Sequence, residues 1–291
     1  MFNKYSLEVP MKTLKIHRLL ILVTVLSGFL RPDATVLFAA GKWSAYTSLQ
    51  FATGNYTFEN STSTYYFYGG IRYRSTRWSL SATIPVITQS SDLVTSTGGG
   101  FLPSENHRNE GSGASHHGSG MGDVEGHSFM ETGLGDLYLF GEYGVLPEQS
   151  VLPYVSANLK LKVPTAGTGN NFGSGEFDYG LGLTLRKSIE NYTGFVDAGY
   201  WILGDPPGAS YKDSFTFGAG LGRFFGYGRY ALMIYFGSYS NIQPEFESNR
   251  QISLGWNYRI NSGLILTVIS GAGMSETSPD FTLSGGLEWT L

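Results

Sequence analysis

Four histidines and several carboxylates gather in one segment, residues 89–134, which is rich in Gly and Ser. The group comprises His107, His116, His117 and His127 with Glu105, Asp123 and Glu125. Imidazole and carboxylate ligands together can bind Zn²⁺, Ni²⁺ or Cu²⁺. Their spacing matches no defined metal site, so a solvated loop without a ligand is the alternative. A segment this long can also fold back as a plug.

The same segment holds the residues of a catalytic alternative. Ser115 and Ser119 flank the histidine pair at 116–117. A Ser–His–Asp site would have to use a histidine of this segment, because no predicted strand carries one. The segment is rich in glycine and shows no set of groups that would orient the imidazole. We therefore predict that the protein is not an enzyme and needs no cofactor, and we keep a hydrolase as the third interpretation.

A second set of candidate residues lies on predicted strands and carries charge. It comprises Arg72, Arg74, Asp136, Glu142, Lys160, Lys162, Asp178, Arg186, Asp197, Arg259 and Glu288. The two signs are nearly balanced, which favours pairing across an interior over a ring of one sign that selects ions. Lys160 and Lys162 are expected to neutralise Asp136 and Asp178. The alternative is that the two lysines line a solute path.

The elements that position these charges are predicted to be β-strands. After residue 42, apolar residues recur at every second position, the period of a strand. The first run is Trp43, Ala45, Thr47, Leu49 and Phe51, and the last covers 281–291. We count about twelve such runs, each near the ~9–11 residues that a strand needs to cross a membrane. Their opposite faces are polar to charged.

The connections between the runs decide between a soluble sandwich and a membrane barrel. Long connections at 53–63, 89–134 and 164–175 alternate with short ones at 75–76, 145–150 and 187–191. Outer-membrane barrels show this alternation, with short periplasmic turns and longer external loops. The sequence therefore predicts an all-β fold, a transmembrane antiparallel up-and-down β-barrel of about twelve strands.

Aromatic residues and glycines fit a barrel. Trp43, Trp78, Trp201, Trp256 and Trp289 fall near predicted strand ends, where amphipathic rings prefer the membrane interfaces. Glycines on the lumen face keep that wall bare, or else ease barrel curvature; they are Gly180, Gly182, Gly218, Gly220 and Gly222.

The direction of the strands assigns heights to the lumen charges. If the first strand runs outward, Asp136, Lys160, Lys162 and Asp178 lie near the external mouth, on three successive strands. Asp197 lies between the two ends. The remaining charged residues lie near the periplasmic end: Arg72, Arg74, Glu142, Arg186, Arg259 and Glu288.

The first forty residues are predicted to be a secretory signal peptide. Lys12, Lys15 and Arg18 precede an apolar run at 19–30, and small residues follow at 39–40. The apolar run is shorter than the ~20 residues that span a bilayer. A single membrane anchor is the alternative. The predicted domains are thus the signal peptide at 1–40 and the barrel at 41–291, with a long external loop at 89–134.

Composition agrees with a membrane barrel. Charged residues are 14% and aromatic residues 15% of the chain, and mean hydropathy is −0.08. A net charge of −4 leaves no basic surface for nucleic acid. Cys is absent, which excludes disulfides and thiolate sites.

Residues 131–205 resemble a family of bacterial outer-membrane proteins named for the meta-pathway of phenol degradation. The motifs are Gly133-Leu134-Gly135-Asp136, Lys160-Leu161-Lys162-Val163-Pro164-Thr165 and Gly173-Ser174-Gly175-Glu176-Phe177-Asp178. The family usually shows Leu-Pro-Thr-Gly, from which Val163-Pro164-Thr165-Ala166-Gly167 departs by a substitution and an inserted residue. The resemblance implies a channel, and the family name implies aromatic or hydrophobic solutes.

Lumen-facing aromatic residues are compatible with such solutes and equally with simple filling of the lumen; they are Tyr66, Tyr68, Tyr138, Phe140, Tyr154, Phe195 and Tyr235. The final strand resembles the C-terminal pattern recognised by the barrel-assembly machinery, although it ends in Leu291.

Taken together, these features predict a Gram-negative outer-membrane channel or transporter for small solutes, exposed to outer-membrane lipid. The alternatives are a closed barrel whose external loops bind a partner or metal, and an outer-membrane lipid hydrolase.

Overall fold

The computed structural model describes residues 41–56, 61–90, 94–97, 100–103, 130–166, 172–206 and 209–291. Throughout these residues, no helix is long and apolar enough to cross a bilayer. The predicted signal peptide at 1–40 and all four histidines of the candidate metal site lie outside the described residues.

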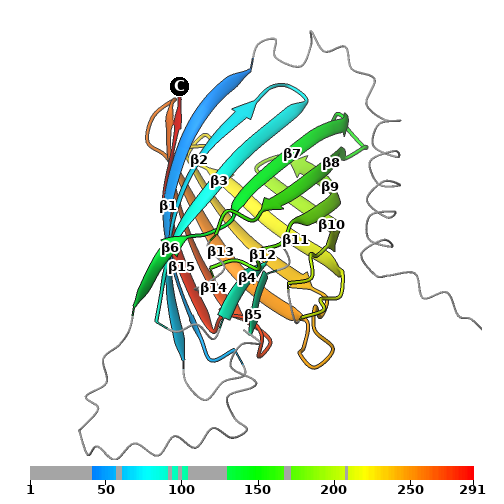
Figure 1. The fold of residues 1–291 in the computed structure, drawn as a ribbon. Helices are drawn as coiled ribbons and strands as arrows, with labels where there is room; N and C mark the ends of the chain where they lie inside the picture. Colours follow the sequence, from blue (N-terminus) through cyan, green and yellow to red (C-terminus); the bar gives the residue numbers. More distant parts are fainter. Residues whose placement is uncertain are drawn as a thin grey trace, which may run out of the picture. The chain divides into compact units, whose positions relative to one another are not determined.

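Twelve strands form a closed antiparallel wall, and one short strand extends it (Figure 1). The wall strands are β1 (Lys42–Gly54), β2 (Thr62–Arg74), β3 (Trp78–Gln89), β7 (Leu137–Leu146), β8 (Tyr154–Val163), β9 (Asp178–Ile189), β10 (Tyr192–Ile202), β11 (Ser214–Phe225), β12 (Tyr230–Tyr239), β13 (Asn249–Arg259), β14 (Leu264–Gly273) and β15 (Phe281–Thr290). The short strand is β6 (Glu131–Leu134). A separate hairpin pairs β4 (Val94–Thr97) with β5 (Gly100–Pro103).

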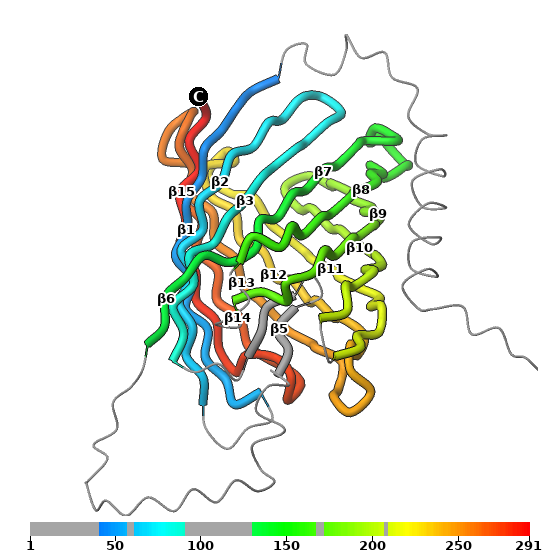
Figure 2. Tube along the Cα trace, in the orientation of Figure 1, coloured from blue at the N-terminus to red at the C-terminus, as the bar shows by residue number. Residues whose placement is uncertain are grey.

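Pairing of the first wall strand with the last closes the barrel. β1 pairs with β2 on one side and with β15 on the other, in a register that runs from Ser44↔Thr290 to Thr53↔Phe281. Every other wall strand pairs with its neighbour along the chain, and the trace in Figure 2 follows this order around the wall. The up-and-down barrel predicted from the sequence is therefore confirmed.

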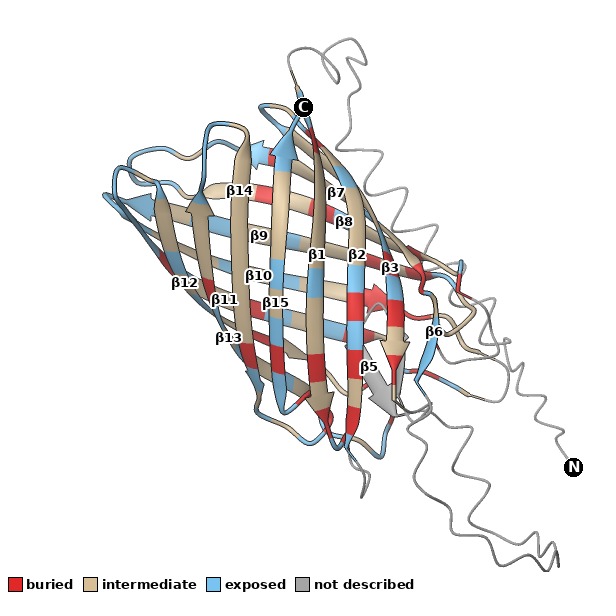
Figure 3. Ribbon diagram, turned by 90° about the vertical axis from the view of Figure 1, so that its left-hand side faces the viewer, coloured by how far each residue is buried: buried red, intermediate tan, exposed pale blue. Residues whose placement is uncertain are grey.

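The two faces of the wall confirm the choice of barrel over sandwich. Apolar side chains at alternate positions point away from the interior, as the exposed fractions of Leu49 (64%), Leu183 (56%) and Phe215 (68%) show. Polar residues of the opposite face, such as Ser44 and Ser156, are buried inside. In Figure 3, most of each wall strand in front is exposed or intermediate, and the buried segments of β1, β2 and β3 lie mainly toward their lower ends. An apolar exterior around a polar interior is the pattern of a barrel in lipid.

The two ends of the barrel differ in the length of their connections. We call the end that carries 55–61, 90–136, 164–177 and 203–213 the long-loop end, and the other the short-turn end. At the short-turn end, Gly226 and Gly228 adopt φ of 59° and 77°, the left-handed conformation that tight hairpins require. The Ser188 N–H donates to Glu148 Oε1 at 2.7 Å, and this hydrogen bond holds the pKa of Glu148 below its usual value.

The segment predicted as one long loop, 89–134, contains more structure than expected. Besides the β4–β5 hairpin, β6 pairs with the outer part of β3, from Val86↔Leu134 to Gln89↔Glu131. β7 pairs with the lower part of β3 as far as Thr83↔Tyr138. Two residues of β3 thus face three residues, 135–137, on the partner side, which is a β-bulge.

The bulge has a local cause in Pro85. Proline has no N–H to donate, so it is confined to bulges and edges of sheets. Here the Gly135 N–H donates to the Pro85 carbonyl at 2.9 Å, and the chain then swings so that Asp136 is buried inside. The bulge therefore aims one carboxylate into the barrel.

Aromatic pairs mark both ends of the outer face. Trp43 and Tyr73 lie 5.2 Å apart near the short-turn end, and Tyr200 and Phe215 lie 4.7 Å apart near the long-loop end. Such rings suit the two membrane interfaces. Trp201 lies at the end of β10, as predicted, but it is on the inner face and 5% exposed, so it does not lie at a membrane interface.

Candidate functional site

Three charged side chains meet inside the barrel at the long-loop end. Lys162 Nζ of β8 lies 3.3 Å from Asp136 Oδ2 and 2.9 Å from Asp178 Oδ2. All three side chains are at most 1% exposed. We call these residues the triad. The pairing that the sequence predicted for Lys162 with both aspartates is present.

The strand register explains why these three residues meet. Lys162 stands directly opposite Asp178 on β9 and opposite Tyr138 on β7. The bulge then places Asp136 two residues beyond Tyr138, on the same inner face. Removal of one partner from a buried ion pair costs about 3–5 kcal/mol, because the remaining charge is uncompensated.

The triad also anchors two connections of the long-loop end. The Ala166 N–H donates to Asp136 Oδ1 at 3.0 Å, and Lys162 Nζ donates to Ser174 Oγ. The Gly204 N–H donates to Asp178 Oδ1 at 2.9 Å. The segments 164–177 and 203–213 are therefore tied to the wall through the same three charges.

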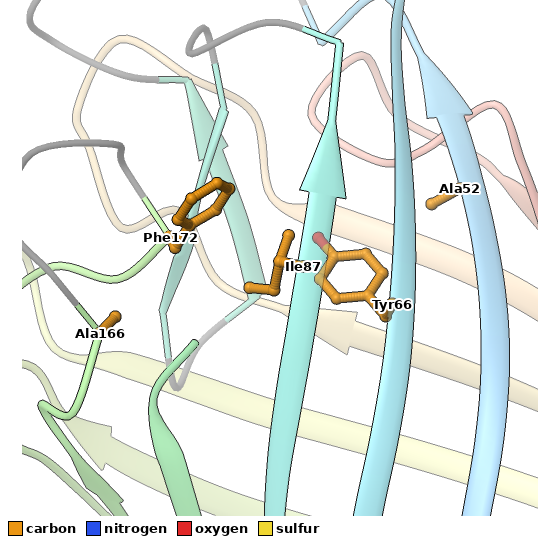
Figure 4. Packing of buried hydrophobic residues seen from close by; sticks show 5 residues of the cluster. All are labelled: Ala52, Tyr66, Ile87, Ala166 and Phe172. Atoms are coloured by element: carbon orange, nitrogen blue, oxygen red, sulfur yellow. The ribbon is translucent and has the colours of Figure 1, made fainter. Parts of the chain in front are cut away.

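Two described residues of the 164–177 connection lie against the inner face of the wall. These residues, Ala166 and Phe172, pack against Ala52, Tyr66 and Ile87, the inner-face residues of β1, β2 and β3. Figure 4 shows Phe172 and Tyr66 on either side of Ile87. We call these five residues the inner cluster.

A second apolar cluster lies at the same end. Trp201 and Leu203 pack with Tyr211 and Ile242 from the connections that follow β10 and β12. Both clusters thus place apolar side chains inside the barrel at the long-loop end.

Lys160 has different surroundings from Lys162. It is half-buried, and its Nζ lies 5.9 Å from the centre of the Trp201 ring. Its charge interacts with that of Asp197 across the lumen face, and Tyr235 Oη donates to Asp197 Oδ2 at 3.5 Å. The two lysines therefore do not act as one pair. Lys162 is covered, whereas Lys160 faces the lumen.

A second charge network lies at the short-turn end. Glu288 of β15 accepts from Arg72 Nη1 at 2.6 Å and from Ser44 Oγ at 2.9 Å, and lies 3.6 Å from Arg74 Nη2. The Arg72 guanidinium also lies over the Tyr46 ring at 4.9 Å. The structure thus brings together three residues that the sequence placed near this end.

The remaining predicted charges lie at the same end without joining that network. The Arg186 guanidinium lies 4.6 Å from the centre of the Tyr154 ring, and Tyr154 Oη donates to Glu142 Oε1 at 3.4 Å. Arg259 is exposed at the end of β13. Within the described part of the chain, no group of three or more carboxylates or imidazoles could hold a metal ion.

The sequence motifs acquire a physical meaning in this site. Motif residues Asp136, Lys162 and Asp178 form the triad, and Thr165 Oγ1 donates to the Gly135 carbonyl at 3.1 Å. A Cβ on Gly173 would stand 2.4 Å from Asp136 Oδ2. What the sequence missed is Phe172 and its inward position.

Comparison with known proteins supports the fold. No family model and no curated protein matches the sequence. An outer membrane channel from Pseudomonas putida F1 matches with a TM-score of 0.62 and 13% identity, over 90% of this chain and all of that one. The KdgM porin matches with a TM-score of 0.49 and 6% identity, over 85% of this chain and 99% of that one. The likeness to the Pseudomonas putida channel shows that the chain has the fold of an outer-membrane barrel.

Proposed function

We propose that this protein is an outer-membrane channel for small solutes, with hydrophobic or aromatic compounds as candidates. The observation that carries the proposal is a closed barrel of twelve strands with an apolar exterior and a polar interior. Eight strands leave an interior that side chains fill, whereas sixteen leave a wide channel. A barrel of intermediate size suits a narrow path.

The first forty residues would act as a secretory signal, and the final strand would be recognised by the barrel-assembly machinery. Both belong to the same proposal, because a barrel with an apolar exterior needs export and insertion. Kinship with the phenol meta-pathway family is supported by the convergence of all three motifs on the triad.

Within this channel, the charged residues would divide into two roles. Lys160 and Asp197 would line the solute path, because both are lumen-facing and Lys160 is half-buried. The triad would instead hold the long-loop end in shape, because its side chains are covered. The other lumen charges, Arg72, Arg74, Glu142, Arg186, Arg259 and Glu288, would set the field at the short-turn end.

Single-channel recording tests the proposal. The full chain, expressed in a Gram-negative host and purified from its outer membrane, is added to a planar bilayer. Discrete conductance steps are expected from protein whose gel migration is heat-modifiable, the sign of a folded barrel. Silence from folded protein at all voltages would contradict the channel and favour a closed barrel.

A further inference from the structure

A cavity of about 270 Å³ lies in the lumen wall directly beside the triad. Its lining includes four aromatic rings and one carboxylate: Tyr66, Tyr68, Tyr138, Phe172 and Asp136. Its volume is close to the ~300 Å³ lower limit for small-molecule pockets. The cavity therefore has room for a ligand of about one ring.

The cavity has a closed side and an open side. Tyr66, Ile87 and Phe172 are buried, at 4%, 2% and 3% exposure, and Figure 4 shows them converging on one region of the interior. Tyr68 of β2 and Tyr138 of β7 are half-buried and lie further from the connections of the long-loop end. A ligand would enter from the lumen past these two rings and stop under Phe172.

The charge beside the cavity is negative. Lys162 is one cation shared by two aspartates, so the fully charged triad has a net charge of −1. Asp136 Oδ1 accepts the Ala166 N–H, but Oδ2 accepts no hydrogen bond from the described residues. Its contact with Lys162 Nζ is 3.3 Å, longer than the 2.9 Å contact of Asp178. Asp136 lines the cavity, so the negative charge that Lys162 leaves uncompensated lies at the cavity wall.

Aromatic faces and a carboxylate favour the same kind of ligand. The face of an aromatic ring carries negative electrostatic potential and attracts cations within about 6 Å of its centre. Tyr66 and Tyr68 add a continuous wall, since their rings stack with centres 5.6 Å apart and planes at 11°. The negative charge of the triad would repel an anion. A neutral aromatic ligand would leave that charge without compensation.

We infer that this cavity is a binding site for a small organic ammonium ion. The ammonium group would lie at the wall that Asp136 forms, held by the net negative charge of the triad, and its carbon substituents would contact Tyr66, Tyr68 and Tyr138. The inference deepens the proposed function. It rests on that function in one respect, because it takes such a cation to be a solute of the channel.

Three probes that differ mainly in charge test the inference. They are benzylammonium, benzyl alcohol and benzoate, titrated by calorimetry into the full chain in detergent. We expect benzylammonium to bind about tenfold more tightly than benzyl alcohol, in keeping with a desolvated cation–π contact, and benzoate to bind more weakly than either. Equal affinity for the cation and the alcohol, or tighter binding of benzoate, would overturn the inference.

Variants locate the binding. Tyr68→Leu should weaken benzylammonium binding about tenfold, whereas Phe224→Leu removes an aromatic residue on β11, outside the cavity lining, and should leave it unchanged. Asp136→Asn should abolish the preference for the cation over the alcohol. If Asp136→Asn fails to fold, Tyr68→Leu still tests the site. An equal loss of benzylammonium affinity in Tyr68→Leu and Phe224→Leu would mean that the cation binds elsewhere.

The outcomes separate the two proposals. Conductance without preferential binding of benzylammonium would overturn the cation site and leave the channel standing. Preferential binding in a folded barrel that conducts nothing would overturn the channel and leave the cation site standing.

Discussion

Lys162 and Asp178 face each other across the β8–β9 register, and the ammonium Nζ lies 2.9 Å from the carboxylate Oδ2 where neither side chain is accessible. The same ammonium lies 3.3 Å from Asp136. One lysine therefore compensates two buried carboxylates, and each carboxylate in turn accepts a backbone N–H from a connection of the long-loop end. The stability of the wall and the position of the loops depend on the same charge.

Lys162→Met should lower the free energy of unfolding by about 3–5 kcal/mol, because it leaves two carboxylates buried without a cation. Urea-dependent loss of heat-modifiable gel migration measures the change. Lys212→Met, at an exposed lysine of the 203–213 connection, is the control and should change little. Equal stability of the two variants would show that the triad does not support the fold.

Gly173→Ala should destabilise the long-loop end by about 1–3 kcal/mol, the usual cost of overpacking. The new Cβ would stand 2.4 Å from Asp136 Oδ2, and the anchored carboxylate has little room to move. Gly69→Ala is the matched control, because nothing lies within 4 Å of its Cβ position. The same urea assay compares them, and a Gly173→Ala protein as stable as the control would contradict this packing.

Lys160→Gln should shift the reversal potential in a salt gradient toward cation selectivity. It removes a positive charge from the lumen and leaves Asp197 without the charge that interacts with it. Lys187→Gln removes a lysine in the short-turn region, where it pairs with Glu148 at 3.6 Å, and is the control. An unchanged reversal potential in Lys160→Gln would exclude Lys160 from the path.

Glu288→Gln should shift the reversal potential in the opposite direction, toward anions. Arg72 and Arg74 would then face the lumen without their shared carboxylate. These side chains are partly solvated, so the stability loss should be only about 1 kcal/mol. Glu247→Gln removes a comparable carboxylate from an exposed pair with Arg250 and should not alter selectivity. A selectivity change as large in Glu247→Gln would argue against a lumen effect.

The wall could be predicted from the sequence because alternation at period two fixes which face each residue occupies. Together with the direction of the strands, this rule predicts that Asp136, Lys162 and Asp178 lie at the same height in the barrel. It could not separate Lys160 from Lys162, which share a face, because the packing of connections at the long-loop end decides which of them is covered. Phe172 was missed because it lies outside any strand, so its position depends on contacts between segments far apart in the chain. Alternation does place Trp201 on the inner face, because its neighbour Tyr200 lies on the outer face beside Phe215.

Phe172→Ala should raise single-channel conductance, because Phe172 is the largest side chain that the 164–177 connection adds to the inner cluster. The substitution should also cost about 3–5 kcal/mol of stability, as for other buried aromatic residues. Phe177→Ala is the matched control, because Phe177 lies in the same connection but is 45% exposed. Larger steps in Phe172→Ala alone are expected in bilayer recordings. Equal conductance in the two variants and the unsubstituted protein would mean that the inner cluster is not the constriction, and the narrowest point would then be sought at Trp201 and Leu203.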